Sequence, residues 1–435
     1  MPMKVILLLA GRSRRFWPLR EKSLFPIAGK TLLEHQVATL KEAGFKDILL
    51  VGGEHNLREI KKMHPKLSTV KQKDLDLGMQ GALLSALPKL KDEPVLIVSG
   101  NDVVDAAAYR SLLAASKGNR GAILAKKVKR YFPGGYIKTK GGRALAIIEK
   151  PGEGKEPSDL VNIVAHIHPS TKRLLSALKG IRKANDDGYE QALTTLMKDD
   201  EYRTVPYAGF WQPVKYPWHL LTLLPHFLAA YAPKQVISKK ASIHKTAVIE
   251  GVVVIEDGVH VLPHATIVGP VFIGKRTIIG NNALVRGSSV GEDCVIGYNT
   301  EVKSSVVSSH VWTHMSYVGD SVIGDNVAFG GGSMTGNFRL DEGEVLSIID
   351  GKKIPTGTTK LGAIIGDNVR LGIQVVMNPG IKIGAGTFVA GGATVSGDLP
   401  DGSFVTMKAG EIQIKENRSY PHDAKNREKY RSKLL

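Results

Sequence analysis

The C-terminal half of the chain carries an aliphatic residue at every sixth position. From Ile243, steps of six reach Ile249, Ile255, Val261, Ile267, Ile273, Ile279 and Val285, and the series resumes at Val290, Ile296 and Val302 and again at Ile365, Leu371, Met377, Ile383, Val389 and Val395. A period of six matches neither the 3.6-residue repeat of a helix nor the two-residue alternation of a strand. It is typical of a hexapeptide β-helix, in which three hexads form one triangular coil. We therefore predict a parallel β-helix over residues 236–410.

The N-terminal half has a different pattern. Short apolar runs at 4–11, 47–53 and 94–102 alternate with amphipathic segments at 31–44 and 78–90. This alternation predicts a Rossmann-like α/β domain with a mostly parallel sheet, whose ligands bind at the carboxyl ends of the strands. We assign residues 1–235 to this domain, including a linker helix within 215–235, and residues 411–435 to a basic C-terminal tail.

Charge and composition narrow the classes of function. The 435 residues carry a formal charge of +18, which favours anionic partners such as nucleic acid or phosphorylated small molecules. No nucleic-acid-binding motif is recognisable, and aromatic residues make up only 6% of the chain. The apolar run at 220–231 is too short to cross a bilayer, which needs about 20 residues. With Cys294 as its single cysteine, the chain has no disulfide and no cysteine cluster for zinc, which fits the cytoplasm. We expect neither a nucleic acid nor a membrane as partner.

Residues 9–35, "LAGRSRRFWPLREKSLFPIAGKTLLEH", resemble the signature of sugar-nucleotidyltransferases. The matching positions are Gly11, Arg15, Pro18, Lys22, Pro26, Gly29 and Lys30. The resemblance continues through 77–83, 99–102, 149–151 and 161–167. Three positions depart from the family pattern: Ser13 and Arg14 replace a glycine and a threonine, and Pro213 replaces an aspartate that often completes the metal site.

The resemblance implies that a sugar 1-phosphate oxygen attacks the α-phosphorus of a nucleoside triphosphate and that pyrophosphate leaves. Such a reaction needs charge neutralisation and alignment more than covalent help. The implied roles are a phosphate-binding turn at Gly11, neutralisation of the leaving group by Arg15 and contact of Lys22 with the α-phosphate. Asp102 would carry Mg²⁺, which prefers oxygen ligands. The residues implied to contact the base and the sugar are Gln80, Gly81, Glu149, Lys150 and Asn162.

Residues 313–345 resemble the acetyltransferase segment of the bifunctional enzymes that make UDP-N-acetylglucosamine. The matching positions are His314, Tyr317, Gly319, Asp320, Gly324 and Asn337. Arg286 and Lys303 fall near basic positions of the family pattern, and Lys360 is at another matching basic position. The implied reaction moves an acetyl group from acetyl-CoA to the amine of glucosamine 1-phosphate. That amine must lose a proton before it attacks, and an imidazole with a pKa near 6.5 is a suitable base.

His314 is accordingly the candidate catalytic base, and Tyr317 and Asn337 would orient the sugar. Backbone N–H groups of the turns near Ala385 and Ala390 would serve acetyl-CoA. His314 also lies where the six-residue spacing fails, at about 303–322, and such interruptions of a repeat are places where function is found.

Together the two resemblances identify the chain as a bifunctional sugar-1-phosphate nucleotidylyltransferase/acetyltransferase. Uridylyl transfer from UTP to N-acetylglucosamine 1-phosphate and a left-handed, homotrimeric β-helix are expectations of that family. Two alternatives stay open: a nucleotidylyltransferase using UTP, dTTP or GTP whose β-helix only trimerises or regulates, and a nucleic-acid-binding or scaffolding protein.

Overall fold

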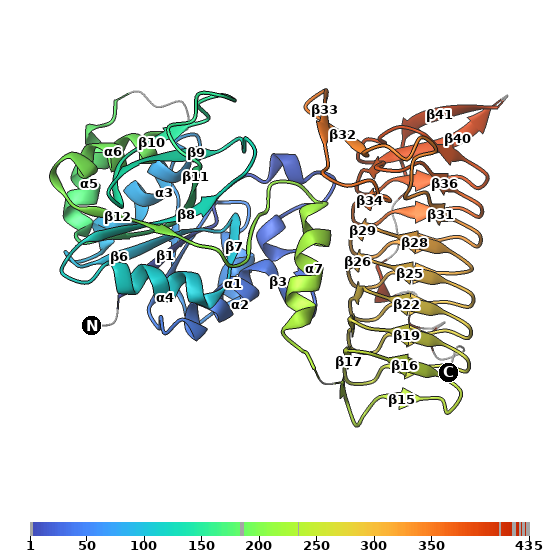
Figure 1. The fold of residues 1–435 in the computed structure, drawn as a ribbon. Coiled ribbons are helices and arrows are strands. Elements are labelled where there is room, and N and C mark those ends of the chain that lie inside the picture. The colour runs from blue at the N-terminus through green and yellow to red at the C-terminus, as the bar shows by residue number, and fades with distance from the viewer. Residues whose placement is uncertain are drawn as a thin grey trace. The chain divides into compact units, whose positions relative to one another are not determined.

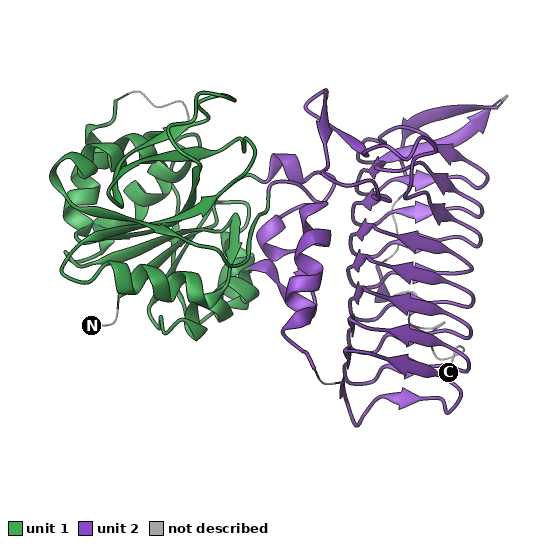
Figure 2. Ribbon diagram, viewed as in Figure 1, with its two compact units in different colours: residues 1–12, 33–214 green, residues 13–32, 215–435 purple. Residues whose placement is uncertain are grey.

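The computed structural model describes residues 3–182, 187–233, 235–408, 410–419, 423–425, 428 and 431. The chain forms two compact units (Figure 2). Unit 1 comprises residues 1–12 and 33–214, and unit 2 comprises residues 13–32 and 215–435. Among the described residues, no helix combines the length and the hydropathy that crossing a bilayer requires.

Unit 1 is built on a nine-stranded sheet with the order β5-β4-β1-β6-β11-β8-β12-β10-β9. Its parallel half consists of β5 (Ser68–Lys71), β4 (Ile48–Gly52), β1 (Lys4–Leu8) and β6 (Val95–Ser99). The remaining strands are β11 (Leu160–His168), β8 (Gly121–Lys127), β12 (Tyr202–Pro206), β10 (Arg143–Glu149) and β9 (Gly135–Lys140). In this half only β12 and β8 pair in parallel, so the predicted parallel sheet is extended by antiparallel strands.

Helices cover the sheet of unit 1 on both faces. The helices are α1 (Leu32–Glu42), α2 (Leu57–Met63), α3 (Gly78–Ala86), α4 (Ala106–Ala115), α5 (Thr171–Gly180) and α6 (Gly188–Asp199). Ile6 and Leu8 of β1 lie in one core with residues of α3, α5 and α6. Val5 and Leu7 point to the opposite face and are also fully buried. Burial on both faces explains why the strands read as continuous apolar runs rather than as alternating patterns.

Unit 2 contains a parallel β-helix made of three sheets of eight, ten and eight strands, with the strands of successive coils stacked along each face (Figure 1). In the first coils Val236 pairs with Val254, eighteen residues later, as three hexads predict. The first sheet contains β14 (Val236–Ile237), β17 (Val253–Ile255), β20 (Val271–Ile273), β23 (Ser289–Val290), β26 (Val306–Val307), β29 (Val322–Ile323), β34 (Ile364–Ile365) and β37 (Lys382–Ile383).

The other two sheets complete the triangle. The second contains β15 (Ser242–Ile243), β18 (His260–Val261), β21 (Ile278–Ile279), β24 (Val295–Ile296), β27 (Trp312–Thr313), β30 (Ala328–Phe329), β35 (Arg370–Leu371), β38 (Phe388–Val389), β40 (Ser403–Lys408) and β41 (Glu411–Glu416). The third contains β16 (Val248–Glu250), β19 (Thr266–Val268), β22 (Leu284–Arg286), β25 (Glu301–Lys303), β28 (Tyr317–Gly319), β31 (Met334–Thr335), β36 (Val376–Met377) and β39 (Thr394–Val395).

The six-step series forms the core of this β-helix. All its members from Ile255 onward are buried in one cluster, and Ile243 and Ile249 pack against it half-buried at the first coil. The prediction of stacked inward-facing aliphatic residues is therefore confirmed.

The coils continue through residues 303–322, where the sequence pattern suggested an interruption. Glu301 pairs with Tyr317, sixteen residues later, and Val306 pairs with Val322. The interruption in the pattern comes from shortened turns, not from a break in the helix. The true insertion follows β31, where residues 336–360 leave the coil and form the hairpin of β32 (Leu346–Ile349) and β33 (Lys352–Pro355) (Figure 1).

Residues 13–32 and α7 (His219–Ala229) complete unit 2. The short segment contains η1 (Arg14–Phe16), η2 (Lys22–Leu24), β2 (Pro26–Ile27) and β3 (Lys30–Thr31). The Ala28 N–H donates to Ser289 Oγ of β23 at 2.8 Å, and Tyr231 Oη donates to Ala28 O at 3.2 Å. Gly29 has φ +79°, and a Cβ there would lie 2.4 Å from the Phe272 ring, so only glycine fits this contact.

The basic tail predicted from residue 411 begins as β41, which pairs antiparallel with β40. Most of residues 420–435 lie outside the part of the chain that the structure describes.

Candidate active sites

In unit 1, Gly11 and Asp102 follow neighbouring strand ends. Leu8 of β1 is paired with Ser99 of β6, and a Cβ on Gly100 would lie 2.8 Å from Leu8 O. The exposed Gly11 and the half-buried Asp102 therefore belong to the same edge of the parallel sheet. This is the edge at which ligands bind in open α/β sheets.

Asp102 begins β7 (Asp102–Val104), which pairs with β13 (Trp211–Pro213), so that Pro213 lies opposite Asp102. One carboxylate oxygen, Oδ1, accepts a hydrogen bond from Trp211 Nε1 at 2.8 Å. The backbone oxygen of Asp102 accepts from Gln36 Nε2 at 3.1 Å. Among the described residues there is no group of three or more His, Cys, Asp or Glu side chains that could hold a metal ion. A single carboxylate at this edge fits an ion whose other ligands are phosphate oxygens and water, as is usual for Mg²⁺.

The predicted sugar-contacting residues Glu149 and Asn162 lie close together. Both flank Gly135 of β9, where a Cβ would lie 2.9 Å from Glu149 Oε2 and 3.5 Å from Asn162 Cβ. Lys150 is adjacent, with Nζ 3.3 Å from Glu149 Oε1 and a positive φ of 45°. A side chain at position 135 would occupy the space between the carboxylate and the amide. The structure therefore brings three of the predicted residues close together.

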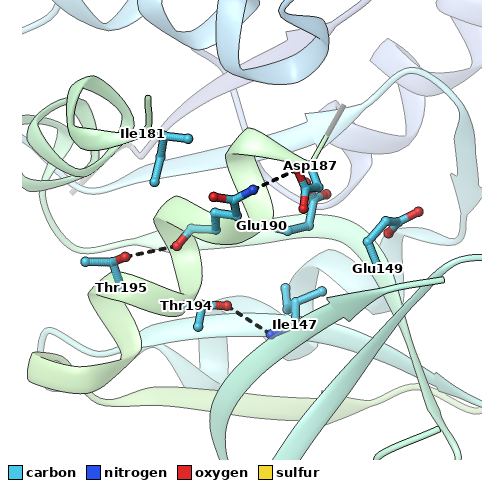
Figure 3. A pocket seen from close by; sticks show the side chains of 8 residues that line it. Ile147, Glu149, Ile181, Asp187, Glu190, Thr194 and Thr195 are labelled. Atoms are coloured by element: carbon cyan, nitrogen blue, oxygen red, sulfur yellow. Dashed lines mark hydrogen bonds between the residues drawn. The ribbon is translucent and has the colours of Figure 1, made fainter. Parts of the chain in front are cut away.

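A pocket of about 310 Å³ lies beside Glu149 between β10 and α6 (Figure 3). Its lining combines carboxylates, hydroxyls and aliphatic groups, contributed by Ile147, Glu149, Ile181, Asp187, Glu190, Gln191, Thr194 and Thr195. Figure 3 shows the Glu149 side chain at one side of the pocket and α6 at the other.

Gln80 does not fit the role implied for it. The side chain is 5% exposed in α3, and its Nε2 donates to Leu178 O of α5 at 3.0 Å. It therefore joins two helices in the core and does not face a nucleotide, which corrects the expectation that it contacts the base. Gly81 lies against the loop before α3, where a Cβ would meet Asp74 O at 2.3 Å. This glycine is required by close backbone packing.

Arg15 and Lys22 belong to unit 2, within the 13–32 segment. Arg15 is exposed, with its guanidinium carbon 5.9 Å from the centre of the Tyr216 ring, and Lys22 is half-buried in η2. The side chains of Trp17 and Arg20, which lie between Arg15 and Lys22 in the sequence, attach this segment to the last coils of the β-helix. Trp17 Nε1 donates to Asp401 Oδ1 at 3.0 Å, and Arg20 Nε lies 3.1 Å from Asp367 Oδ2.

Lys382 forms the buried part of the contact between the 13–32 segment and the β-helix. This side chain is 1% exposed, and its Nζ donates to Ser347 Oγ at 3.1 Å and to Ile348 O at 2.9 Å. It pairs with Asp398 at 2.5 Å and lies 5.7 Å from the centre of the Trp17 ring. Lys382 thus joins β37, the β32–β33 hairpin and the 13–32 segment. No sequence motif indicated this role, because a lysine at a strand position reads as a surface residue.

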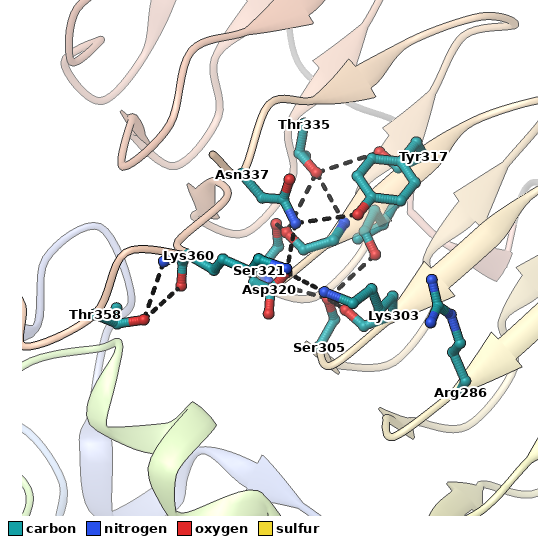
Figure 4. Close-up of polar contacts among 12 residues, drawn as sticks. Arg286, Lys303, Ser305, Tyr317, Asp320, Ser321, Thr335, Asn337, Thr358 and Lys360 are labelled. Atoms are coloured by element: carbon teal, nitrogen blue, oxygen red, sulfur yellow. Dashed lines mark hydrogen bonds and ion pairs between the residues drawn. The ribbon is translucent and has the colours of Figure 1, made fainter. Parts of the chain in front are cut away.

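On the third sheet of the β-helix, four predicted residues form one polar cluster (Figure 4). Lys303 Nζ lies 2.9 Å from Asp320 Oδ2, with side-chain exposures of 18% and 14%. Asn337 Nδ2 donates to Asp320 Oδ2 at 2.5 Å and to Tyr317 Oη at 3.0 Å. Burial raises the pKa of the Tyr317 hydroxyl, so it stays protonated. The cluster comprises a cation, a carboxylate, an amide and a phenol.

Two further cations border this polar cluster. Arg286 is stacked on Lys303 through the pairing of β22 with β25, and its Nη2 lies 2.6 Å from Glu301 Oε1. Lys360 pairs with Phe338, next to Asn337, and its Nζ lies 5.8 Å from the Phe338 ring centre. Glu301 was not singled out from the sequence. Its position two residues before Lys303 places it on the same face of β25, and this spacing could have identified it as a neighbour of the cluster.

His314 lies at the other end of β28 from the Lys303–Asp320 pair. It is exposed, in the turn that joins β27 to β28, and its imidazole makes no hydrogen bond to any residue that the structure describes. A three-residue strand at about 3.3 Å per residue separates the two ends by roughly 10 Å. The structure therefore places the candidate base and the polar cluster along one strand, without joining them directly.

The turns beside His314 form an exposed apolar column. Met315 N donates to Tyr298 O, Gly332 N to Met315 O, and Gln374 N to Gly331 O, so that these turns stack. Large apolar side chains remain exposed on this column and on the adjoining strands: Tyr298 at 45%, Met315 at 47%, Met334 at 47%, Ile373 at 64% and Val376 at 41%. Contiguous exposed apolar residues of this kind mark interaction surfaces.

The backbone amides of Ala385 and Ala390 are already used within the chain. The Ala385 N–H donates to Asp401 Oδ1 and the Ala390 N–H donates to Val405 O, both at 2.8 Å. Neither amide is free to hold a thioester oxygen or a pantetheine arm, which corrects that expectation. Because stacked coils are hydrogen-bonded to one another, they use the amides that an isolated turn would leave without a partner.

Comparison with known proteins gives matches to both parts of the chain. Residues 5–244 match the MobA-like NTP transferase domain, and residues 362–397 match the bacterial transferase hexapeptide (six repeats). The hexapeptide match agrees with the predicted left-handed type of β-helix.

Three relatives match over nearly the whole chain. A bifunctional sugar-1-phosphate nucleotidylyltransferase/acetyltransferase from Sulfurisphaera tokodaii is 34% identical, with 92% of this chain and 99% of that protein covered. The bifunctional protein GlmU of Methanococcus maripaludis is 31% identical, with coverages of 96% and 100%. The protein of the same name from Methanocaldococcus jannaschii is 30% identical, with coverages of 93% and 97%. The chain therefore belongs to the family of bifunctional sugar-1-phosphate nucleotidylyltransferase/acetyltransferases.

Proposed function

We propose that this chain catalyses two steps of nucleotide-sugar synthesis. Unit 2 transfers the acetyl group of acetyl-CoA to the amine of glucosamine 1-phosphate. The NTP transferase domain transfers uridylyl from UTP to the resulting N-acetylglucosamine 1-phosphate and releases pyrophosphate. The observation that carries the first activity is the arrangement of an exposed imidazole and a cation-rich polar cluster at opposite ends of β28.

An amino sugar phosphate lying along β28 contacts the functional groups at both ends of the strand. Its phosphate meets Lys303 and Arg286, while Tyr317 and Asn337 contact the ring, and Lys360 adds charge at the border. The amine then lies toward His314, which accepts its proton. The amine nitrogen bonds to the thioester carbonyl carbon, the carbon–sulfur bond breaks, and the departing thiolate takes the proton from His314.

This acetyl transfer needs no covalent enzyme intermediate. The single cysteine, Cys294, is fully buried in the β-helix core, and burial raises the pKa of its thiol to about 12. A thiol in this state is not a nucleophile at neutral pH. Direct attack by the amine is the step that the available side chains support.

For nucleotidyl transfer, Asp102 would hold Mg²⁺ together with phosphate oxygens of the nucleotide. When bound, the ion neutralises charge on the phosphates. Arg15 and Lys22 supply further positive charge, and the turn at Gly11 allows close approach of the phosphates. Glu149, Lys150 and Asn162 contact the sugar beside Gly135.

We further propose that the active form is a homotrimer in which the apolar column beside His314 packs against another copy. The support is the exposed row Tyr298, Met315 and Ile373, which a monomer would leave in water. Such a contact would also complete the acetyl-CoA site, since the N–H groups of Ala385 and Ala390 are bonded within the chain. The lone buried thiol is compatible with the reducing cytoplasm as the compartment.

A substrate panel tests the proposed function. Purified full-length protein should release CoA thiol from acetyl-CoA with glucosamine 1-phosphate and not with glucose 1-phosphate. It should release pyrophosphate most efficiently with UTP and N-acetylglucosamine 1-phosphate among four nucleoside triphosphates. Pyrophosphate release without any acceptor-dependent thiol release would instead favour a nucleotidylyltransferase whose β-helix only assembles the protein.

A further inference from the structure

Four buried side chains behind the Glu149–Asn162 site form one hydrogen-bonded network. His166 and His168 of β11 are fully buried, and Tyr189 of α6 and Tyr202 of β12 are each 1% exposed. We call these four residues the His–Tyr network. Tyr202 Oη lies 2.8 Å from His168 Nδ1, and His168 Nε2 lies 2.9 Å from Tyr189 Oη. Tyr189 Oη lies 2.9 Å from His166 Nδ1, and His166 Nε2 lies 2.7 Å from Asn162 Oδ1.

The number of hydrogens in this network is fixed by burial. Desolvation lowers the pKa of His166 to about 3 and that of His168 well below its usual value, so both imidazoles are neutral at physiological pH. A neutral imidazole carries one N–H, and a phenol carries one O–H. Four hydrogens are therefore available for the four contacts that run from Tyr202 to Asn162.

Donation in one direction along the network uses all four hydrogens within it. Tyr202 donates to His168 Nδ1, His168 Nε2 donates to Tyr189, Tyr189 donates to His166 Nδ1, and His166 Nε2 donates to Asn162 Oδ1. In the reverse direction the Tyr202 hydroxyl hydrogen would have no acceptor within the network. An unsatisfied donor in the protein interior is unfavourable, so the forward direction is the stable one.

We propose that the His–Tyr network fixes the orientation of the Asn162 amide and so sets which substrate atom it binds. With Oδ1 turned toward His166, the Nδ2 amino group is the donor that the amide offers to a ligand. Beside it across Gly135, the Glu149 carboxylate can only accept. The site thus presents one donor and one acceptor to the sugar, which selects a hydroxyl or acetamido oxygen opposite Asn162. His166 is a positioning residue in this scheme, which rests on the proposed sugar contacts of Asn162 and Glu149.

The tautomers of the two histidines test the direction without any assay of activity. In ¹⁵N-labelled full-length protein, the imidazole nitrogen shifts of His166 and His168 should both report the Nε2–H form at pH 7. Nδ1–H forms for both residues, or an imidazolium for either, would overturn the assigned orientation.

Kinetic variants test the consequence for the substrate. His166→Leu should raise KM for the sugar 1-phosphate about tenfold, with kcat and KM for the nucleotide changed less than about twofold. His166→Gln, which keeps an N–H donor, should recover most of the loss. Thr171→Val is a matched control, because it removes a buried hydrogen bond to Lys91 O in the same unit without touching the network. It should lower thermal stability and leave KM for the sugar unchanged.

The outcomes separate this inference from the proposed function. If Asn162→Ala raises KM for the sugar but His166→Leu does not, the orienting role of His166 is refuted. If Asn162→Ala leaves KM for the sugar unchanged, the proposed sugar site itself is refuted, whatever the tautomers are.

Discussion

The indole N–H of Trp17 donates to the carboxylate of Asp401 at 3.0 Å, across 384 positions of sequence. Both residues belong to unit 2. The same oxygen, Asp401 Oδ1, accepts the N–H of Ala385, so one carboxylate joins the 13–32 segment to a turn of the last coils. The segment that carries the nucleotidyltransferase signature is thus held by the β-helix, and the β-helix contributes to the position of Arg15 and Lys22.

Weakening this attachment should impair nucleotidyl transfer selectively. Trp17→Phe removes the N–H donor, so residues 13–32 sample more conformations before the nucleotide binds. KM for the nucleoside triphosphate should rise about three- to tenfold while the rate of acetyl transfer stays the same. Asp401→Asn keeps an acceptor oxygen for both donors and should resemble the wild type. Equal losses of both activities in Trp17→Phe would indicate misfolding and would contradict the prediction.

Replacing the candidate base should have the opposite selectivity. His314→Ala should lower kcat for acetyl transfer about 10²- to 10⁴-fold, because the protonated amine no longer has an acceptor for its proton. Pyrophosphate release should not change. His264→Ala is a matched control, since His264 is another exposed turn histidine of the β-helix. An acetyl transfer rate in His314→Ala within tenfold of the wild type would exclude His314 as the base.

The two carboxylates beside the candidate phosphate site should differ in their contribution to stability. Asp320 is largely enclosed and bonded to both Lys303 and Asn337, whereas Glu301 pairs with the more exposed Arg286. Asp320→Asn leaves an enclosed ammonium without its counter-charge and should cost about 1–3 kcal/mol of unfolding free energy. Glu301→Gln should cost less than about 1 kcal/mol, as exposed pairs do. Denaturation of the two variants under identical conditions measures the difference, and equal losses would contradict it.

Mild acid should destabilise unit 1 through its buried histidines. The pKa of His166 is lowered to about 3, and that of His168 is also strongly lowered, mainly by desolvation. In the unfolded chain both histidines bind a proton near pH 6.5, so the unfolded state gains protons that the folded state does not bind. Their contribution to stability is complete above pH 6.5 and is lost as the pH falls, by up to about 1.4 kcal/mol per pH unit for each residue.

Urea denaturation followed between pH 7 and pH 5 checks this dependence. The midpoint should decrease with pH, and the slope should be shallower in His168→Gln, which removes one of the two groups. A midpoint independent of pH across this interval would show that the histidines are protonated in the folded protein.

Cys294 should be unreactive while the protein is folded. Burial raises the pKa of its thiol to about 12, compared with about 8.5 in an unfolded chain. At pH 8.5 the thiolate fraction is therefore lower by roughly 10³-fold, and labelling by a thiol reagent should be slower by at least that factor until urea unfolds the chain. Cys294→Ala should retain acetyl transfer, because no acyl-cysteine forms. Rapid labelling of the native protein would contradict both expectations.

The sequence alone determined the architecture, because both halves repeat a pattern that backbone geometry enforces. Inward-facing positions such as Ile255 and Ile273 recur every six residues only if the chain coils in three-sided turns, and the apolar runs of β1, β4 and β6 fit only strands buried on both faces. The motifs also singled out Glu149, Asn162, Lys303 and Tyr317 as candidate substrate contacts.

The tertiary structure decided which residues far apart in sequence contact one another. The burial of Gln80 against Leu178, the use of the Ala385 amide by Asp401 and the attachment of Trp17 to the β-helix depend on how distant elements pack. The His–Tyr network is a further case, because its direction of hydrogen-bond donation depends on Tyr202, which lies 40 positions from Asn162 along the chain. Local pattern sets which face of an element is apolar, but the partner of each buried polar group is chosen only when those faces meet.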